Sequence, residues 1–421
     1  MVQKRMKVAF IVGDFPDEIG SFVSDQIDEG VNNGLDISIF AVSESKKPFA
    51  KKFLDSCKYK EKIFFINVPR NMFLRYLKAS WLMLANIFTH PGAIFRALSF
   101  KNYKQVAWTL MPLYFKLYFL NRKNNFDIIH SHFGQRGIYG AAIKEEGIQG
   151  KLVTSFYGGD LSYFVKQTNP QVYNILIQEG DLFLPLSSNF KEIWLNLGGP
   201  KNKTIVHRVG IDLSNFSYYQ RPSKKSTNIL MIARFVEKKG HIYAIAAFSQ
   251  IVKKHPQTKL TLVGDGPLLD SIKQLVKKLN LEDKIEFIGK VSTIQLPEIY
   301  RSADIYLLPS LTASDGDKEG TPVSLMEAQA TGLPIIGTTH SGIPEVVVNG
   351  KTGFLVAEKD SYALADKLSF LINNPSKRIE MGKAGQKYVK ENYEKKRQAE
   401  KLLYLYRSII ANNQNDKNLL L

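Results

Sequence analysis

Short apolar segments rich in Val, Ile and Leu alternate with longer segments of helical period along the whole chain. This alternation predicts repeated β-α units with parallel sheets, an α/β fold. The predicted strands of the first half are residues 8–12, 37–40, 63–68, 128–130, 152–156, 182–185 and 205–209. Those of the second half are residues 228–232, 259–263, 285–288, 305–308 and 335–337.

Helical patterns fill the intervals between the strands. Residues 72–119 predict two or three helices, broken near Pro91 and Gly92. The helices of the second half are expected to begin near Gly240, Pro267, Gln295 and Pro322. A final polar helix is predicted at about residues 376–412.

Two series of strands predict two domains, which the length of 421 residues also favours. The polar, basic segment NFSYYQRPSKKST lies outside both series and is the expected linker. The predicted division is an N-terminal domain at 1–214, the linker at 215–227, a C-terminal domain at 228–395, and a C-terminal helix and tail at 396–421. The C-terminal helix is expected to pack back toward the N-terminal domain.

The composition, 44% hydrophobic and 23% charged, is that of a globular protein. No run of about 18 uncharged apolar residues predicts a membrane-spanning helix. The first apolar run is short and leads into Gly13 and Pro16, which favours a buried strand over a signal peptide. The single cysteine, Cys57, excludes an internal disulfide and a cysteine-based metal cluster. We therefore expect a cytoplasmic protein.

Positive charge is concentrated in residues 46–123. The whole chain has a net charge of +18, and this segment has 16 Lys and Arg against Asp55 and Glu61, a net charge of +14. Aromatic residues are interleaved with these cations, a pattern that suits an anionic membrane surface. It would also suit nucleic acid, but no nucleic-acid-binding motif accompanies it. A solvated basic surface over an aromatic core is the simpler alternative. We expect membrane contact and no nucleic-acid partner.

The segment with the most candidate functional residues is 315–327, DGDKEGTPVSLME. Gly320, Thr321 and Pro322 precede a helical pattern, and proline suits the first helical position. The free amides of such a helix N-terminus bind phosphate. Glu319 and Glu327 are eight residues apart, so a helix would place both carboxylates on one wall of a cleft, where they could accept hydrogen bonds from a sugar and a ribose. An ordinary capped surface helix is the alternative.

Two cations follow the first strand of the second half. Arg234 and Lys239 lie at the carboxyl end of that strand, where open α/β sheets bind ligands. Fixed cations there could stabilise a departing pyrophosphate without a metal ion. Two solvated loop cations are almost as good an interpretation of this motif taken alone.

Two further strand ends carry weaker signals. LVGDGP contains Gly264 in a turn after a strand, but it lacks the full G-x-G-x-x-G pattern. FIGKV ends the next strand, and Lys290 and Val291 could flank a base. A structural glycine turn is the alternative interpretation, and either motif in isolation favours it.

The first half offers candidates for the opposite side of a cleft. Gly20 lies in GDFPDEIGSF, which joins the first strand to a helix. His130 and His132 lie in DIIHSHFG, and Tyr157 and Asp160 lie in SFYGGD. The two histidines could bind a metal, line a polar cleft or be structural. No carboxylate accompanies them at a ligand spacing, so no metal site is expected.

Taken together, these motifs resemble the signature of glycosyltransferase family 4. The resemblance rests on RFVEKKG, LVGDGP, FIGKV, ADIYLLPS, EGTPVSLMEAQATGLP and HSGIPEVVVNGKTGFLV. In the first half, FPDEIGSFV and HSHFG are similar to bacterial exopolysaccharide and colanic-acid-type transferases. The similarity is clear over residues 205–395 and looser over 1–165.

The resemblance implies a GT-B fold, two Rossmann-like domains whose parallel sheets face each other across a cleft, the first on the acceptor side and the second binding the donor. It implies that Glu319 contacts the donor sugar, Glu327 the ribose, and Arg234 and Lys239 the diphosphate. Amides near Gly320, Thr321 and Pro322 would assist, and Lys290 and Val291 would lie near the base. Tyr157 stands where many relatives have histidine, so His130, Tyr157 and Asp160 are weaker candidates.

The expected activity is retaining transfer from a nucleoside diphosphate sugar to a saccharide, without a metal or other cofactor, in exopolysaccharide or lipopolysaccharide biosynthesis. A lipid-linked acceptor at the inner face of the cytoplasmic membrane would match the basic segment 46–123. The alternatives are a sugar-nucleotide epimerase or phosphorylase on the same fold and a non-catalytic nucleotide-sugar binder.

Overall fold

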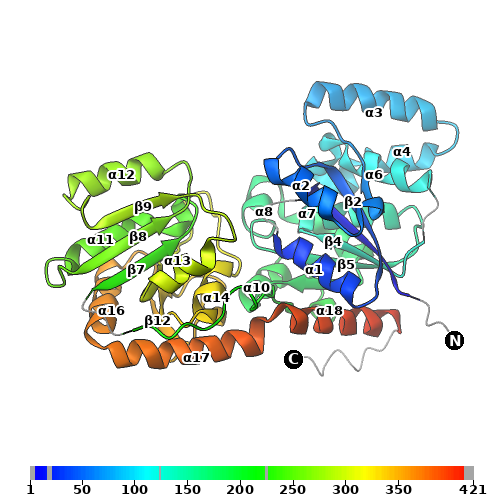
Figure 1. Cartoon of the computed structure of the whole chain (residues 1–421). Helices are drawn as coiled ribbons and strands as arrows, with labels where there is room; N and C mark the ends of the chain where they lie inside the picture. The colour runs from blue at the N-terminus through cyan, green and yellow to red at the C-terminus, as the bar shows by residue number, and fades with distance from the viewer. Residues whose placement is uncertain (1–4, 17–20, 123–124, 223–225, 412–421) are drawn as a thin grey trace. The chain divides into compact units, whose positions relative to one another are not determined.

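The computed structural model describes residues 5–16, 21–122, 125–222 and 226–411 (Figure 1). The contacts between residues divide the chain into two units. Unit 1 comprises residues 1–208 and 398–421, and unit 2 comprises residues 209–397. The chain therefore passes between the units twice, after Arg208 and after Arg397.

Unit 1 is built on a six-stranded parallel sheet with the order β3-β2-β1-β4-β5-β6. Its strands are β1 (Lys7–Phe15), β2 (Asp36–Glu44), β3 (Ile63–Phe65), β4 (Ile128–His132), β5 (Lys151–Phe156) and β6 (Leu182–Pro185). The strand order changes direction between β1 and β4. Ligands of open α/β sheets bind at the carboxyl ends of strands at such a switch.

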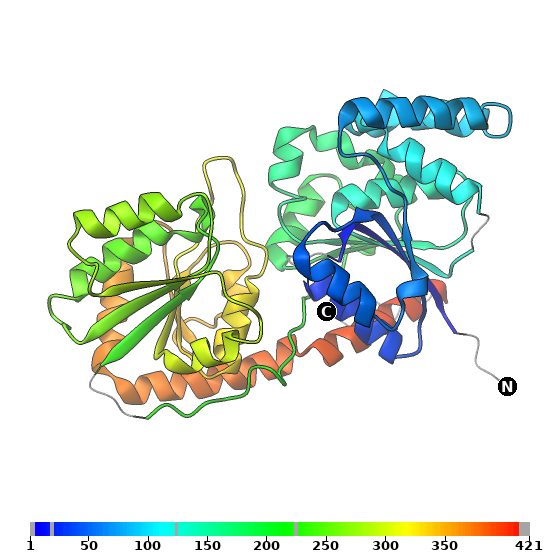
Figure 2. The ribbon, with the colours of Figure 1, turned by 45° about the horizontal axis from the view of Figure 1, so that its top comes forward.

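The helices of unit 1 cover both faces of its sheet, and on one face they form more than one layer. They are α1 (Ser21–Asn32), α2 (Pro48–Ser56), α3 (Met72–Asn86), α4 (Pro91–Ala97), α5 (Phe100–Tyr103), α6 (Met111–Leu120), α7 (Gly134–Lys144), α8 (Tyr163–Gln167), α9 (Asn174–Glu179) and α10 (Ser188–Asn196). Helix α7 packs on β4 and β5, α6 packs on α7, and α3 and α4 pack on α6. Both views show α3 at the outer margin of unit 1 (Figure 2).

The C-terminal helix α18 (Lys395–Ile410) completes the core of unit 1. Leu402, Leu405 and Tyr406 are buried with Val8 and Phe10 of β1. The Tyr406 hydroxyl also lies 2.5 Å from Nδ1 of His130 in β4. Residues almost three hundred positions apart in the sequence thus share one core.

Unit 2 contains a second six-stranded parallel sheet with the order β12-β11-β10-β7-β8-β9. Its strands are β7 (Thr227–Ile232), β8 (Thr258–Val263), β9 (Ile285–Gly289), β10 (Ile305–Leu308), β11 (Ile335–Thr338) and β12 (Gly353–Val356). Its helices are α11 (His241–Ile251), α12 (Leu269–Lys278), α13 (Leu296–Ser302), α14 (Val323–Ala330), α15 (Ile343–Val346), α16 (Ser361–Asn373) and α17 (Pro375–Tyr393). The strand order changes direction between β7 and β10.

The prediction of two parallel α/β sheets is confirmed, but several elements differ. Residues 72–119, predicted as two or three helices, form the four helices α3, α4, α5 and α6. The strand predicted at 205–209 is wrong, because this segment only donates backbone hydrogen bonds to the edge of β6, as from Ile205 to Phe183 at 3.0 Å. Strand β12 was not predicted. The helix predicted at 376–412 is two helices, because Ile211 pairs with the backbone on both sides of Glu394.

The described part of the predicted linker, residues 215–222, packs on unit 2. Phe216 is buried in the core of that unit. The guanidinium group of Arg221 donates hydrogen bonds to the carbonyl oxygens of Ala303, Tyr300 and Thr331. Burial lowers the pKa of Arg221 to about 10.

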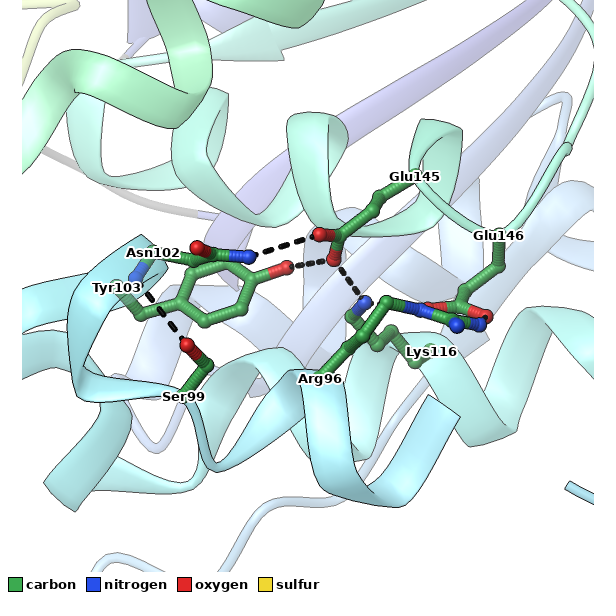
Figure 3. A network of polar contacts seen from close by, with 7 residues as sticks. All are labelled: Arg96, Ser99, Asn102, Tyr103, Lys116, Glu145 and Glu146. Carbon is green, nitrogen blue, oxygen red and sulfur yellow. Dashed lines mark hydrogen bonds and ion pairs between the residues drawn. The ribbon is translucent and has the colours of Figure 1, made fainter. Parts of the chain in front are cut away.

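A buried ionic cluster joins the outer helices of unit 1 to α7 (Figure 3). Lys116 of α6 is fully buried and forms ion pairs with Glu145 and Glu146, which follow α7. Arg96 of α4 donates to Glu146, and Tyr103 of α5 donates to Glu145 at 2.7 Å. Burial raises the pKa of Glu146, but hydrogen bonds from Arg96 and Lys116 outweigh it, so the pKa lies below its ordinary value.

We expect Lys116→Met to destabilise unit 1 by about 3–5 kcal/mol, because it leaves two buried carboxylates without their cation. All three tryptophans lie in unit 1, at positions 81, 108 and 194, so urea unfolding followed by tryptophan fluorescence measures the effect. Lys60→Met is the control, because the Lys60–Asp55 pair is exposed and its loss should not be measurable.

Adding Glu145→Gln and Glu146→Gln to Lys116→Met should recover part of the lost stability. If the single variant unfolds at the same urea concentration as the unchanged protein, the cluster does not hold these helices together.

Candidate functional site

The sequence-predicted residues of unit 2 gather at the carboxyl edge of its sheet, around the switch between β7 and β10. Arg234 is exposed two residues beyond β7, and Lys239 ends the 3-10 turn Glu237–Lys239. Gly240 then starts α11 with φ +72°, and a Cβ atom there would lie 2.0 Å from the carbonyl oxygen of Pro309. Only glycine fits this close approach of the β7 and β10 loops.

Lys239 and Glu319 form a buried ion pair at this edge. Lys239 Nζ lies 2.7 Å from Glu319 Oε1, and the side chains are 15% and 6% exposed. Burial raises the pKa of Glu319, but the charges of Lys239 and Lys238 outweigh it, so the pKa is below its ordinary value. Glu319 is therefore ionised at neutral pH, and its stabilising effect is lost only as the pH falls through that lowered pKa.

His340 fixes the backbone of Glu319. The amide N–H of Glu319 donates to His340 Nε2 at 3.0 Å, so Nε2 carries no proton. The proton is on Nδ1, which donates to Glu358 Oε1 at 2.6 Å. Glu358 also accepts from the amide of Thr312 at 2.9 Å, and Ser341 donates to the carbonyl oxygen of Glu319 at 2.7 Å. Together these bonds set the position of the glutamate.

Helix α14 begins beside this pair. Pro322, predicted at the first helical position, instead has ψ 114° and is the N-cap residue before Val323. Thr321 Oγ1 is buried and has no hydrogen-bond partner. A buried hydroxyl without a partner is costly unless a ligand or water satisfies it, so Thr321 points to a binding site.

Glu327 lies in α14, and its carboxylate has Tyr300 of α13 as a hydrogen-bond partner. Tyr300 Oη donates to Glu327 Oε2 at 2.7 Å. Burial raises the pKa of Glu327 to about 7, opposed by the hydrogen bond from Tyr300. Its protonation state therefore changes near neutral pH, unlike that of Glu319.

The glycine turns after β8 and β9 lie beside the β7 loop. A Cβ atom at Gly264 would lie 2.1 Å from the carbonyl oxygen of Ala233, next to Arg234. The amide of Gly264 donates to the carbonyl oxygen of Gly289 at 2.9 Å. Lys290 follows Gly289 and is exposed, and Val291 packs on the core of unit 2. The carboxyl ends of β7, β8, β9 and β10 thus carry the predicted residues along one edge.

The candidates of unit 1 cluster at the ends of β4 and β5. His130 is fully buried, and its ring nitrogens contact Tyr406 and, at 2.8 Å, Ser155 Oγ. Asp160 accepts backbone hydrogen bonds from Gly134 at 2.9 Å and from Gly158 at 2.8 Å. Both side chains have structural partners. Gly20 lies outside the described residues.

Tyr157 is half-buried, and its hydroxyl lies 2.8 Å from His132 Nδ1. Burial lowers the pKa of His132 to about 3, so the ring is neutral, and its Nε2 atom has no hydrogen-bond partner. In the part of the chain that the structure describes, no three His, Cys, Asp or Glu side chains gather as a metal site would require.

Sequence reasoning missed His340, Glu358, Tyr300 and Arg136. His340 stands in the motif HSGIPEVVVNGKTGFLV, which contributed to the resemblance without a role for this residue. The one sequence feature that could have pointed to His340 is its place shortly after the buried strand predicted at residues 335–337. Arg136 lies in α7 with its guanidinium group over Gly13 at the β1–β4 switch, and its Nε atom is buried without a partner.

Comparison with known proteins shows the family to which the chain is similar. Residues 219–388 match the family model described as glycosyl transferases group 1. WcaL of Salmonella typhimurium, named for colanic acid biosynthesis as a glycosyltransferase, is 31% identical over 369 residues, 86% of this chain and 90% of WcaL. AmsK of Erwinia amylovora, an amylovoran biosynthesis glycosyltransferase, is 32% identical over 368 residues, 86% of this chain and 89% of AmsK.

The structure of Anabaena HepE in complex with UDP and glucose superposes with a TM-score of 0.71 at 17% identity, covering 96% of this chain and 100% of HepE. This likeness shows that the chain has the GT-B fold. Together with the similarity to WcaL and AmsK, it identifies the class. The chain belongs to the group 1 glycosyltransferase family.

We expect His340→Ala to increase hydrogen–deuterium exchange in the loop that contains Glu319, because the amide of Glu319 loses its acceptor. His340→Gln should retain part of the protection, since its side-chain oxygen can replace Nε2. Mass spectrometry of peptides covering residues 312–322 measures the change.

His255→Ala, a change at a half-buried histidine four residues beyond the end of α11, is the control. Equal protection in His340→Ala and the unchanged protein would mean that His340 does not position Glu319.

Proposed function

We propose that this protein transfers a sugar from a nucleoside diphosphate sugar to a saccharide acceptor with retention of anomeric configuration, as a member of glycosyltransferase family 4. The observation that carries the proposal is the buried Lys239–Glu319 pair, which lies just before the start of α14 and has Arg234 on the same loop after β7. This arrangement puts fixed cations and an ionised carboxylate together at the ligand-binding edge of a sheet.

Arg234 and Lys239 would bind the diphosphate and stabilise the negative charge that develops as the glycosidic bond breaks. The N–H groups at the start of α14 and the hydroxyl of Thr321 would add donors. Glu319 would accept hydrogen bonds from the sugar hydroxyls, and Glu327 from the ribose. Crystal structures of HepE hold UDP and UDP-glucose, which supports a nucleotide-sugar donor on the same fold.

Retention most simply follows attack by the acceptor hydroxyl on the face that the diphosphate leaves. The departing phosphate would accept the proton of that hydroxyl. Charge stabilisation by Arg234 and Lys239 would not call for a metal ion, so we expect transfer to persist in EDTA.

The names of WcaL and AmsK support a place in exopolysaccharide biosynthesis. We propose a lipid-linked acceptor and a location at the inner face of the cytoplasmic membrane, on the basis of the basic aromatic segment 46–123. Among the described residues, no helix has the length and apolar character needed to cross a membrane.

Glu319→Gln and Lys239→Met should each lower kcat/KM for transfer by at least about 100-fold, because each removes a charge aimed at the reacting groups. A thermal-shift panel of UDP-, GDP- and ADP-sugars would first identify the donor, since a ligand that binds only the folded state raises Tm. Lys273→Met, at an exposed lysine of α12, is the control.

Folded variants with unchanged turnover would reject this site assignment. Turnover of the donor without any acceptor would instead indicate an epimerase.

Donor affinity should rise with pH up to about 7 and then level off, because only ionised Glu327 accepts hydrogen bonds from both ribose hydroxyls. Tyr300→Phe removes the hydrogen bond that lowers the pKa of Glu327, so the rise should move to higher pH. Donor titrations between about pH 5.5 and 8.5 would measure both curves. A flat profile in the unchanged protein would contradict a role for Glu327 at the ribose.

A further inference from the structure

Helix α3 carries an apolar stripe that faces away from unit 1. Phe73, Leu77, Trp81 and Leu84 recur at helical spacing, and Phe88 continues the series just beyond the helix. Their exposed fractions are 70%, 54%, 66%, 74% and 96%. The opposite side of α3 includes buried Ala79 and packs on α6. The helix thus has an inner packed face and an unpartnered apolar outer face.

The stripe continues onto neighbouring elements. The hydroxyl of Tyr76 in α3 donates to the carbonyl oxygen of Trp108 at 2.8 Å. The ring of Trp108 lies 6.4 Å from that of Phe100, which begins α5. Both side chains are at least half exposed. We call the eight residues Phe73, Tyr76, Leu77, Trp81, Leu84, Phe88, Phe100 and Trp108 the outer patch.

The segment of the chain that carries the outer patch contains no acidic residue of its own. The sequence has neither Asp nor Glu between Glu61 and Asp127. Several cations of the same region are already engaged, since Lys116 is buried and Arg70 and Arg96 form ion pairs. Lys101 is exposed next to Phe100. The surface is therefore mainly apolar with a basic edge, and less electrostatic than the net charge of residues 46–123 suggests.

Hydrogen bonds and ion pairs hold the helices that carry the outer patch in place. The guanidinium group of Arg75 donates to the carbonyl oxygen of Pro69 at 2.8 Å, and Tyr114 of α6 donates to the carbonyl oxygen of Arg75 at 2.8 Å. The buried cluster around Lys116 holds α4, α5 and α6 to α7 beneath it. The apolar side chains are presented by packed helices, so binding need not order them first.

We propose that the outer patch docks onto a lipid bilayer, with its apolar side chains inserted into the boundary between head groups and acyl chains. An exposed patch of this kind marks an interaction site. A bilayer fits it because tryptophan and tyrosine favour the membrane–water interface, and because residues 62–126 contribute no carboxylate that would repel anionic head groups, while Glu145 and Glu146 nearby are paired with cations. Burial of the apolar side chains of the outer patch would drive this docking, which does not depend on the chemistry proposed for unit 2.

Tryptophan fluorescence tests the docking directly. Trp194 is fully buried, so Trp108→Phe leaves Trp81 as the one exposed tryptophan of the chain. Vesicles of phosphatidylcholine and phosphatidylglycerol should shift its emission to shorter wavelength, and lipids brominated on their acyl chains should quench it. Lack of both responses would overturn the proposal.

Leu77→Glu together with Leu84→Glu, introduced beside Trp81, should weaken vesicle binding at least tenfold without lowering Tm, because both side chains are exposed. Raising the salt concentration should weaken it less than this double change does. Ile294→Glu, at a residue of unit 2 that is 87% exposed, is the control and should bind normally.

Three results would reject a bilayer as the occupant: an equal loss in the control, complete release by salt alone, or lipid-free self-association that the double variant abolishes. The last result would indicate a second copy of the chain. Transfer to a soluble acceptor should be unchanged in the double variant, so failure of docking and failure of the proposed activity can be told apart.

Discussion

The ion pair between Lys239 and Glu319 is the interaction on which the site of unit 2 depends. Two opposite charges are taken out of water here, and a buried pair is stable only when both groups also have good geometry and further partners. The chain supplies these through a glycine that lets the β7 and β10 loops approach and through the His340–Glu358 contact behind Glu319. The site is therefore organised before any ligand arrives.

The two glutamates of this site differ because their surroundings differ. Glu319 lies next to cations, which keep its pKa below the ordinary value. Glu327 accepts a hydrogen bond from a neutral tyrosine instead, and burial raises its pKa to about 7. One carboxylate is thus permanently charged at neutral pH and the other can lose its charge, although they lie eight residues apart in one motif.

The sequence predicted the fold well, and it predicted that the candidate residues of unit 2 share one edge of a sheet, because both follow from local patterns. Apolar strand segments define the sheets, and the ends of parallel strands fall on one edge, so Arg234, Gly264 and Glu319 could be placed together. His340 and Glu358 could not be paired from the sequence, since their contact arises from the packing of β11 and β12, and β12 was itself missed. His130 looked like a ligand at a strand end, but its partner Tyr406 comes from a distant helix.

That long-range contact has a consequence for the order in which the protein can form during synthesis. The core of unit 1 includes Leu402, Leu405 and Tyr406, whereas every residue of unit 2 precedes position 398. During synthesis every residue of unit 2 is therefore added before the residues of helix α18 that complete the core of unit 1. The part of the protein translated first can reach its finished state only after this late segment becomes available to it.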